Sequence, residues 1–108
     1  MKIIYKPRLA GKTTELIKLA SKGKYKLIVC YSRQDADRIF KHSLEMEKRK
    51  EIKHHPPLPI TYDEFLRGKY YGKNIESFLI DNAEFLITYL SKGVPIEAIT
   101  LTKENKEG

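Results

Sequence analysis

Short apolar runs alternate with stretches of helical periodicity along the chain. Five runs have the length of β-strands and lie at residues 3–5, 27–31, 58–61, 78–80 and 96–101. The second run is apolar without alternation, as expected for a strand covered on both faces, and Pro59 in the third run indicates an edge position. Because strands that alternate with helices are typical of parallel sheets, the sequence predicts an α/β fold with a mostly parallel five-stranded sheet.

Four helices are predicted between these runs. The first spans residues 13–21 and places Leu16, Ile17 and Ala20 on one face. The second begins after Ser32, a good N-cap, and ends in a charged stretch at residues 47–51. A short third helix, from residue 62 or 63 to 67, ends before a glycine, and the fourth spans 83–90.

Length and composition favour one globular domain. The chain has 108 residues, of which 41% are hydrophobic, so we expect one domain at residues 1–102 and a polar tail at 103–108. No apolar stretch approaches the roughly 20 residues that a membrane helix needs, and no signal peptide precedes the first strand. The single cysteine, Cys30, lies in an apolar run and is expected in the core. These features predict a cytoplasmic protein with no membrane partner.

A strand followed by Gly-Lys-Thr-Thr and a helix is the order that a phosphate-binding loop requires. Gly11 would allow the backbone to approach the phosphates, Lys12 would reach the β and γ phosphates, and the Thr13 hydroxyl would bind Mg²⁺. The predicted nucleotide-binding residues are Pro7, Arg8, Leu9, Ala10, Gly11, Lys12, Thr13 and Thr14.

The loop motif is incomplete, which keeps an alternative open. The usual pattern G-x-x-x-x-G-K-[ST] would place its first glycine at residue 6, where this chain has Lys6. The alternative interpretation is a glycine turn with a solvent-exposed lysine at the start of a helix.

An apolar strand that ends in a carboxylate supplies the second half of the expected site. Asp81 follows the run at 78–80, and in phosphate-loop enzymes such an aspartate holds Mg²⁺ at the carboxyl edge of the sheet. We therefore predict that Thr13 and Asp81 are the metal ligands. The alternative is that Asp81 caps the following helix.

Hydrolysis depends on the residues that follow Asp81. Many phosphate-loop enzymes place a glutamate directly after the aspartate, but this chain has Asn82, which can hold a water and cannot take its proton. Glu84 could substitute as the base, although an acidic residue is also favourable in the first turn of a helix. The predicted catalytic residues are Lys12, Asn82 and Glu84.

These motifs resemble those of P-loop ATPases with a RecA-like core, the class that includes helicases and terminase motors, and most of all small bacteriophage ATPase-like proteins. The similar segments are residues 8–13, 29–34, 59–66, 79–84 and 99–102. The resemblance implies a three-layer sandwich in which the strands, numbered along the chain, take the order first, fifth, fourth, second, third. It also implies ATP and Mg²⁺ as cofactors.

Positive charge extends the prediction to nucleic acid. The 21 Lys and Arg exceed the 14 Asp and Glu, for a net charge of +7, which favours polyanions. Tyrosines among cations at 67–73 could stack on bases, or the segment could be a surface turn with one tyrosine packed inward. The resemblance adds the segment that contains Arg33. The predicted nucleic-acid contacts are Arg33, Arg67, Lys69, Tyr70, Tyr71 and Lys73.

Together these features predict a Mg²⁺-dependent ATPase in phage or mobile-element DNA transactions, acting as a homo-oligomer or with a larger motor partner. Two alternatives remain: a degenerate phosphate-loop protein that binds nucleotide or DNA without turnover, and an adaptor that binds a protein partner.

Overall fold

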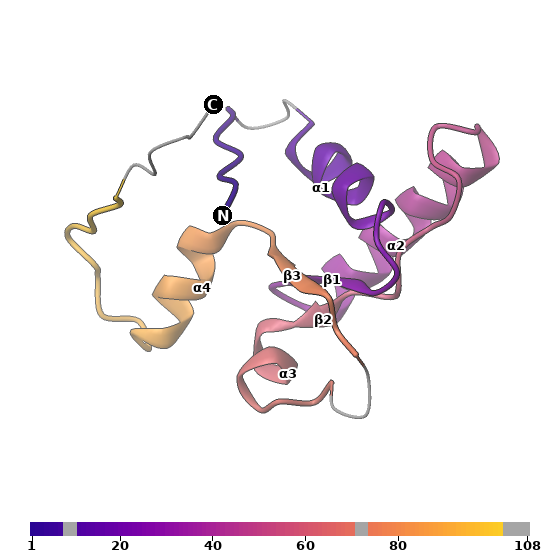
Figure 1. Ribbon diagram of the computed structural model, residues 1–108. Coiled ribbons are helices and arrows are strands. Elements are labelled where there is room, and N and C mark those ends of the chain that lie inside the picture. Colours follow the sequence, from indigo (N-terminus) through magenta and orange to yellow (C-terminus); the bar gives the residue numbers. More distant parts are fainter. Residues whose placement is uncertain (8–10, 71–73, 103–108) are drawn as a thin grey trace.

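The computed structural model describes residues 1–7, 11–70 and 74–102. Its helices lie around a small sheet (Figure 1). In chain order the elements are α1 (Lys12–Ala20), β1 (Lys26–Cys30), α2 (Arg33–Lys48), β2 (Ile60–Thr61), α3 (Tyr62–Leu66), β3 (Ser77–Ile80) and α4 (Ala83–Leu90).

The sheet is parallel, and β1 is its central strand. The order is β2-β1-β3, with Val29 opposite Ile60 on one side and opposite Ile80 on the other. The last four residues of β1 are buried, as its continuous apolar pattern predicts. The edge position of β2, which follows Pro59, is confirmed, and so is the relative order of these three strands.

The five-stranded, RecA-like three-layer sandwich expected from the sequence is wrong for this structure. Among the described residues the sheet has three strands, because the runs at 3–5 and 96–101 do not pair with it. Residues 92–102 are exposed throughout, and of residues 3–5 only Ile4 packs against the core.

These two runs stay outside the sheet because a high strand propensity does not by itself provide a neighbouring strand to pair with. β-Branched residues favour extended backbone, but an extended segment becomes a strand only when a neighbouring strand takes up its hydrogen bonds. Lys92 and Gly93, both at positive φ, turn the chain after α4, and the segment that follows does not reach the sheet.

The core lies between β1 and the two helices α1 and α2. The Ser32 hydroxyl caps α2 by accepting a hydrogen bond from the Asp35 amide at 3.2 Å, as its sequence position predicts. The predicted apolar face of α1 is confirmed by the burial of Leu16, Ile17 and Ala20. The buried cluster comprises Leu16, Ile17, Ala20, Ile28, Cys30, Ala36, Ile39, Met46 and Ile52.

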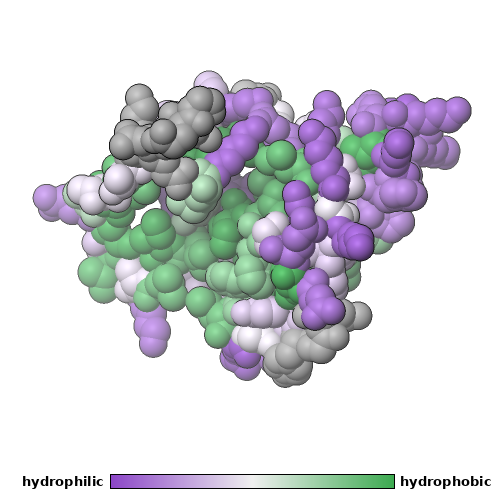
Figure 2. Space-filling model, in the orientation of Figure 1, coloured by the Kyte–Doolittle hydropathy of each residue, from purple (hydrophilic) through white to green (hydrophobic). Residues whose placement is uncertain are grey.

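Helix α4 has the predicted bounds but lies apart from this core. It is strongly apolar, yet none of its residues is buried, and Phe85 and Leu90 are about half exposed. Figure 1 places α4 on the far side of the strands from α1 and α2, and Figure 2 shows hydrophobic surface on that side of the molecule. In the described part of the chain, no helix combines the length and hydrophobicity needed to cross a bilayer.

The contrast between β1 and the 96–101 segment can be measured with one substitution in each. Ile28 has no exposed surface, so Ile28→Ala should lower the free energy of unfolding by about 2–5 kcal/mol. Ile99 is 56% exposed, and Ile99→Ala should change that free energy by less than about 0.5 kcal/mol. Urea unfolding of both variants tests the expectation. An equal loss in the Ile99 variant would contradict the exposed placement of this segment.

Candidate functional site

Gly11 starts α1 in a conformation that favours glycine. It is the N-cap residue of the helix, with φ +81° and no side-chain cap. A Cβ built at Gly11 would meet no heavy atom within 4 Å, so its positive φ, rather than crowding, is the reason for glycine here. The predicted loop residues Arg8, Leu9 and Ala10 lie outside the described residues, and Pro7 is exposed.

Lys12, the first residue of α1, reaches the turn that follows β3. Its Nζ lies 3.5 Å from Oδ1 of Asn82, a residue 70 positions away in the chain. The backbone amide of Asp81 donates to the Val29 carbonyl at 2.8 Å, so this turn begins directly at the carboxyl end of the sheet. The fold thus brings together Lys12 and the turn containing Asp81, two parts of the predicted site.

The Asp81 carboxyl group is held largely out of water. The residue is 7% exposed, and its burial raises the pKa of the carboxyl group, while the nearby positive charge of Lys12 and then that of Arg38 lower it. An ionised carboxylate in such a place destabilises the folded protein unless a positive charge neutralises it. Asp81 does not cap α4: the N-cap residue is Asn82, which makes no side-chain cap hydrogen bond.

Tyr62 holds the acidic turn in place. Its side chain is fully buried, and its hydroxyl shares its one proton between the backbone carbonyls of Asp81 at 2.6 Å and Asn82 at 2.9 Å. Its ring makes edge contacts with Tyr31 and Tyr89. Sequence reasoning missed this role, because Tyr62 had the pattern of an ordinary residue at the start of a short helix.

The two predicted catalytic residues of the turn differ in their surroundings. Asn82 has φ +53°, a conformation that asparagine tolerates better than most residues, and its side chain faces Lys12. Glu84 is exposed in the first turn of α4, and its charge acts on the Asp81 carboxyl group, whose pKa it raises. A carboxylate therefore lies near Asp81 and open to solvent.

Lys6 and Thr14, on either side of the Gly11-Lys12 pair, have side-chain partners of their own. Lys6, which occupies the position of the missing glycine, forms an ion pair with Glu15 at 2.6 Å. Thr14 contacts the ring of His42 at 3.0 Å between its hydroxyl and Nε2. Thr13, the second predicted metal ligand, is partly buried in the first turn of α1.

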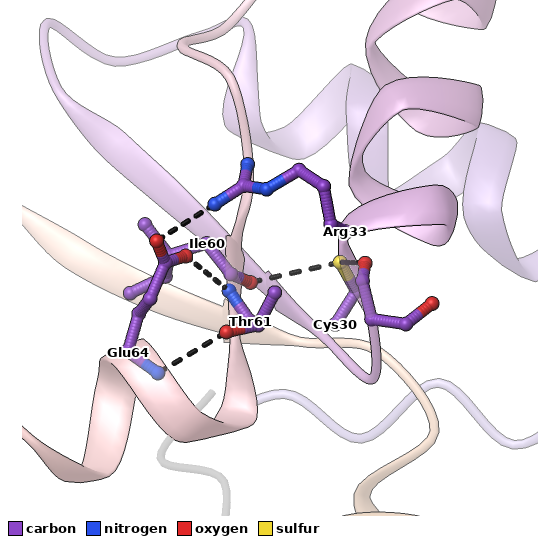
Figure 3. Close-up of polar contacts among 6 residues, drawn as sticks. Cys30, Arg33, Ile60, Thr61 and Glu64 are labelled. Atoms are coloured by element: carbon purple, nitrogen blue, oxygen red, sulfur yellow. Dashed lines mark hydrogen bonds and ion pairs between the residues drawn. The ribbon is translucent and has the colours of Figure 1, made fainter.

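A polar network at the ends of β1 and β2 includes Arg33, one of the predicted nucleic-acid contacts (Figure 3). Arg33 pairs with Glu64 at 2.7 Å, and the other oxygen of Glu64 accepts from the Thr61 amide at 2.9 Å in a capping box. The Cys30 thiol points to the Ile60 carbonyl at 3.6 Å, and burial raises its pKa to about 12. Cys30 is therefore a buried core residue, as predicted, and Arg33 is engaged within the protein.

The predicted stacking segment is also partly engaged. Arg67 pairs with Asp63 at 3.0 Å, and Tyr70 packs against Phe65 and Phe78, while Lys69 is exposed. The inward position of Tyr70 agrees with the alternative interpretation of residues 67–73, a surface turn with one tyrosine packed inward. The other residues predicted for this surface, Tyr71 and Lys73, lie outside the described residues.

The side chains around Asp81 offer too few ligands to hold a metal ion by themselves. They suit a metal ion that is also bound by the phosphates of a ligand. No group of three or more His, Cys, Asp or Glu side chains in the described residues could hold a metal ion. Asp81 offers one carboxylate, and Mg²⁺ at nucleotide sites uses one or two carboxylates together with phosphates and waters.

Comparison of the chain with protein-family models, with curated proteins and with solved structures finds no match to any of them. What this site can do must therefore be inferred from its own residues.

Removing the Tyr62 hydroxyl tests its hold on the turn. Tyr62→Phe leaves two partly or fully buried carbonyls without this donor, and we expect the free energy of unfolding to fall by about 1–3 kcal/mol. Tyr31→Phe is the control, because Tyr31 is 57% exposed and should change stability by less than about 0.5 kcal/mol. Urea unfolding measures both, and equal small effects would contradict the anchoring role.

The pKa of Asp81, raised from its ordinary value of 3.8, predicts how stability depends on pH. Because the folded state holds the proton more tightly than the unfolded state, the ionised carboxyl group destabilises the fold above its folded pKa, and this effect is lost below 3.8. Asp81→Asn should therefore be more stable than the wild type at pH 7, with a difference that shrinks as the pH falls toward 3.8.

Urea unfolding at several pH values measures this difference, and Asp37→Asn, on the exposed side of α2, is the control. An Asp81→Asn variant that is less stable at pH 7 would show that the carboxylate is stabilised by its surroundings, which contradicts the prediction.

Proposed function

We propose that the chain binds a nucleoside triphosphate with Mg²⁺ at the carboxyl edge of its sheet. The observation that carries the proposal is the approach of Lys12 to the Asp81–Asn82 turn, with 3.5 Å between Lys12 Nζ and Asn82 Oδ1. A cation at a helix N-terminus and a buried carboxylate at the end of a neighbouring strand suit a phosphate group and its metal ion.

Each residue has a separate task in this proposal. The N-terminus of α1 and the Lys12 ammonium attract the phosphate oxygens, and Lys12 exchanges its contact with Asn82 for a charged ligand. Asp81, with the Thr13 hydroxyl, would hold the Mg²⁺, which neutralises phosphate charge. Binding the ion offsets the cost of keeping the Asp81 carboxylate out of water.

Turnover is a separate step with a separate requirement. The attacking water must give up a proton, and Asn82 cannot accept it. Glu84 is an exposed carboxylate whose charge acts on Asp81, so we propose it as the base for an ATPase reaction. Binding without hydrolysis is the second candidate, favoured by the amide at position 82 in place of the usual carboxylate.

Calorimetry with Mg²⁺-ATP tests the binding proposal. Lys12→Ala removes a charged hydrogen bond worth about 1.5–3 kcal/mol, so the Kd should rise about 10- to 100-fold. Lys41→Ala, in the exposed part of α2, is the matched control and should bind as the wild type does. Asp81→Asn should weaken binding in Mg²⁺ and have little effect in EDTA. Absence of heat from the wild type at millimolar nucleotide would overturn the proposal.

Phosphate release then distinguishes the two candidates. Steady release that Glu84→Gln abolishes, with nucleotide affinity unchanged, supports the ATPase. Binding by the wild type without release supports the second candidate.

A further inference from the structure

A groove lies at the opposite edge of the sheet, where the strands begin. A cavity of about 760 Å³ opens between the end of α1, the segments that lead into β1 and β3, and the segment after α2. A second cavity of about 350 Å³ shares four lining residues with it and continues toward the prolines before β2. The residues common to both are Ser21, Gly23, Lys24 and His54.

Positive charge dominates the lining of this groove. Four lysines and two glutamates line the larger cavity, and all four lysines are exposed. Glu76 uses one oxygen to accept from the backbone amide of Lys24 at 3.1 Å. The four lysines are Lys18, Lys22, Lys24 and Lys53.

These lysines differ from the cations at the other edge of the sheet. Arg33, Arg38 and Arg67 are each paired with a carboxylate. Within the described residues, none of the four groove lysines forms such an ion pair. Their charges are therefore available to an anion from solution.

The shape and chemistry of the lining favour a chain of phosphates. The two cavities adjoin and form an elongated surface, and the lysines gather in the larger one. The exposed side chains of Lys48, Arg49 and Lys50 directly precede the lining residue Glu51 in the chain and add positive charge next to it. Among the described residues, the lining includes no Tyr, Phe or Trp on which a base could stack. Lysines without such aromatic partners contact the phosphate backbone and carry no base preference.

We propose that this groove binds the sugar–phosphate backbone of nucleic acid without regard to sequence. The site lies at the amino edge of the sheet, away from Lys12 and Asp81, and does not depend on nucleotide binding. It places part of the excess positive charge of the chain at one surface.

Fluorescence anisotropy with a labelled oligonucleotide of mixed sequence tests the proposal, with single-stranded and duplex forms in separate titrations. The double variant Lys22→Gln/Lys53→Gln should weaken binding and lower the slope of log affinity against log salt by about 2, since each lost phosphate contact lowers it by about 1. The control Lys41→Gln/Lys92→Gln removes the same charge from exposed sites outside the groove and should leave the slope unchanged. The form with the larger loss identifies the preferred strand state.

Two outcomes would overturn the proposal. One is an equal loss in both double variants, which would indicate general charge attraction. The other is competition by inorganic phosphate as effective as that by oligonucleotide at the same phosphate concentration, which would indicate a small-anion site. Titrations in a Lys12→Ala background separate the two proposals, because the groove should bind oligonucleotide unchanged when nucleotide binding fails.

Discussion

The hydrogen bond from the Asp81 amide to the Val29 carbonyl fixes the acidic turn, residues 81–82, at the carboxyl edge of the sheet. Val29 lies in the central strand β1, which is paired on both sides and buried. Because β1 cannot shift without exposing its side chains, the end of β3 is fixed relative to the start of α1. Lys12 can then meet a turn that is far away in the sequence.

Two features of the acidic turn, residues 81–82, lower the stability of the folded protein. Asp81 is a nearly buried carboxyl group, and Asn82 adopts a left-handed backbone conformation. The fully buried Tyr62 stabilises the turn in spite of both, because its hydroxyl contacts the backbone carbonyls of the two residues. The combination of strain and desolvation in two adjacent residues, held by a third, is common at ligand sites and supports the proposed function.

The two edges of the sheet carry different electrostatics. At the carboxyl edge, cations and carboxylates are matched, as with Arg33 and Glu64, and Lys12 faces the acidic turn. At the amino edge, four lysines that form no ion pair with the described part of the chain gather around an open groove. A compact ligand with its own metal ion suits the first, and an extended polyanion suits the second. A parallel sheet keeps the two surfaces apart, because all its strands start at one edge and end at the other.

The sequence by itself determined the local elements and the identity of the chemical groups. The apolar pattern located α4, the Ser32 cap, the buried central strand and the proline-marked edge strand, because periodicity and capping depend on nearby residues. The expectation for the outer strands failed at residues 3–5 and 96–101, because pairing depends on contacts distant in the chain. The tertiary structure alone decided that Tyr62 anchors Asp81, that Arg33 is paired with Glu64, and that four lysines share a groove. Each of these juxtapositions joins residues from different elements, and such distances are created only when the chain packs.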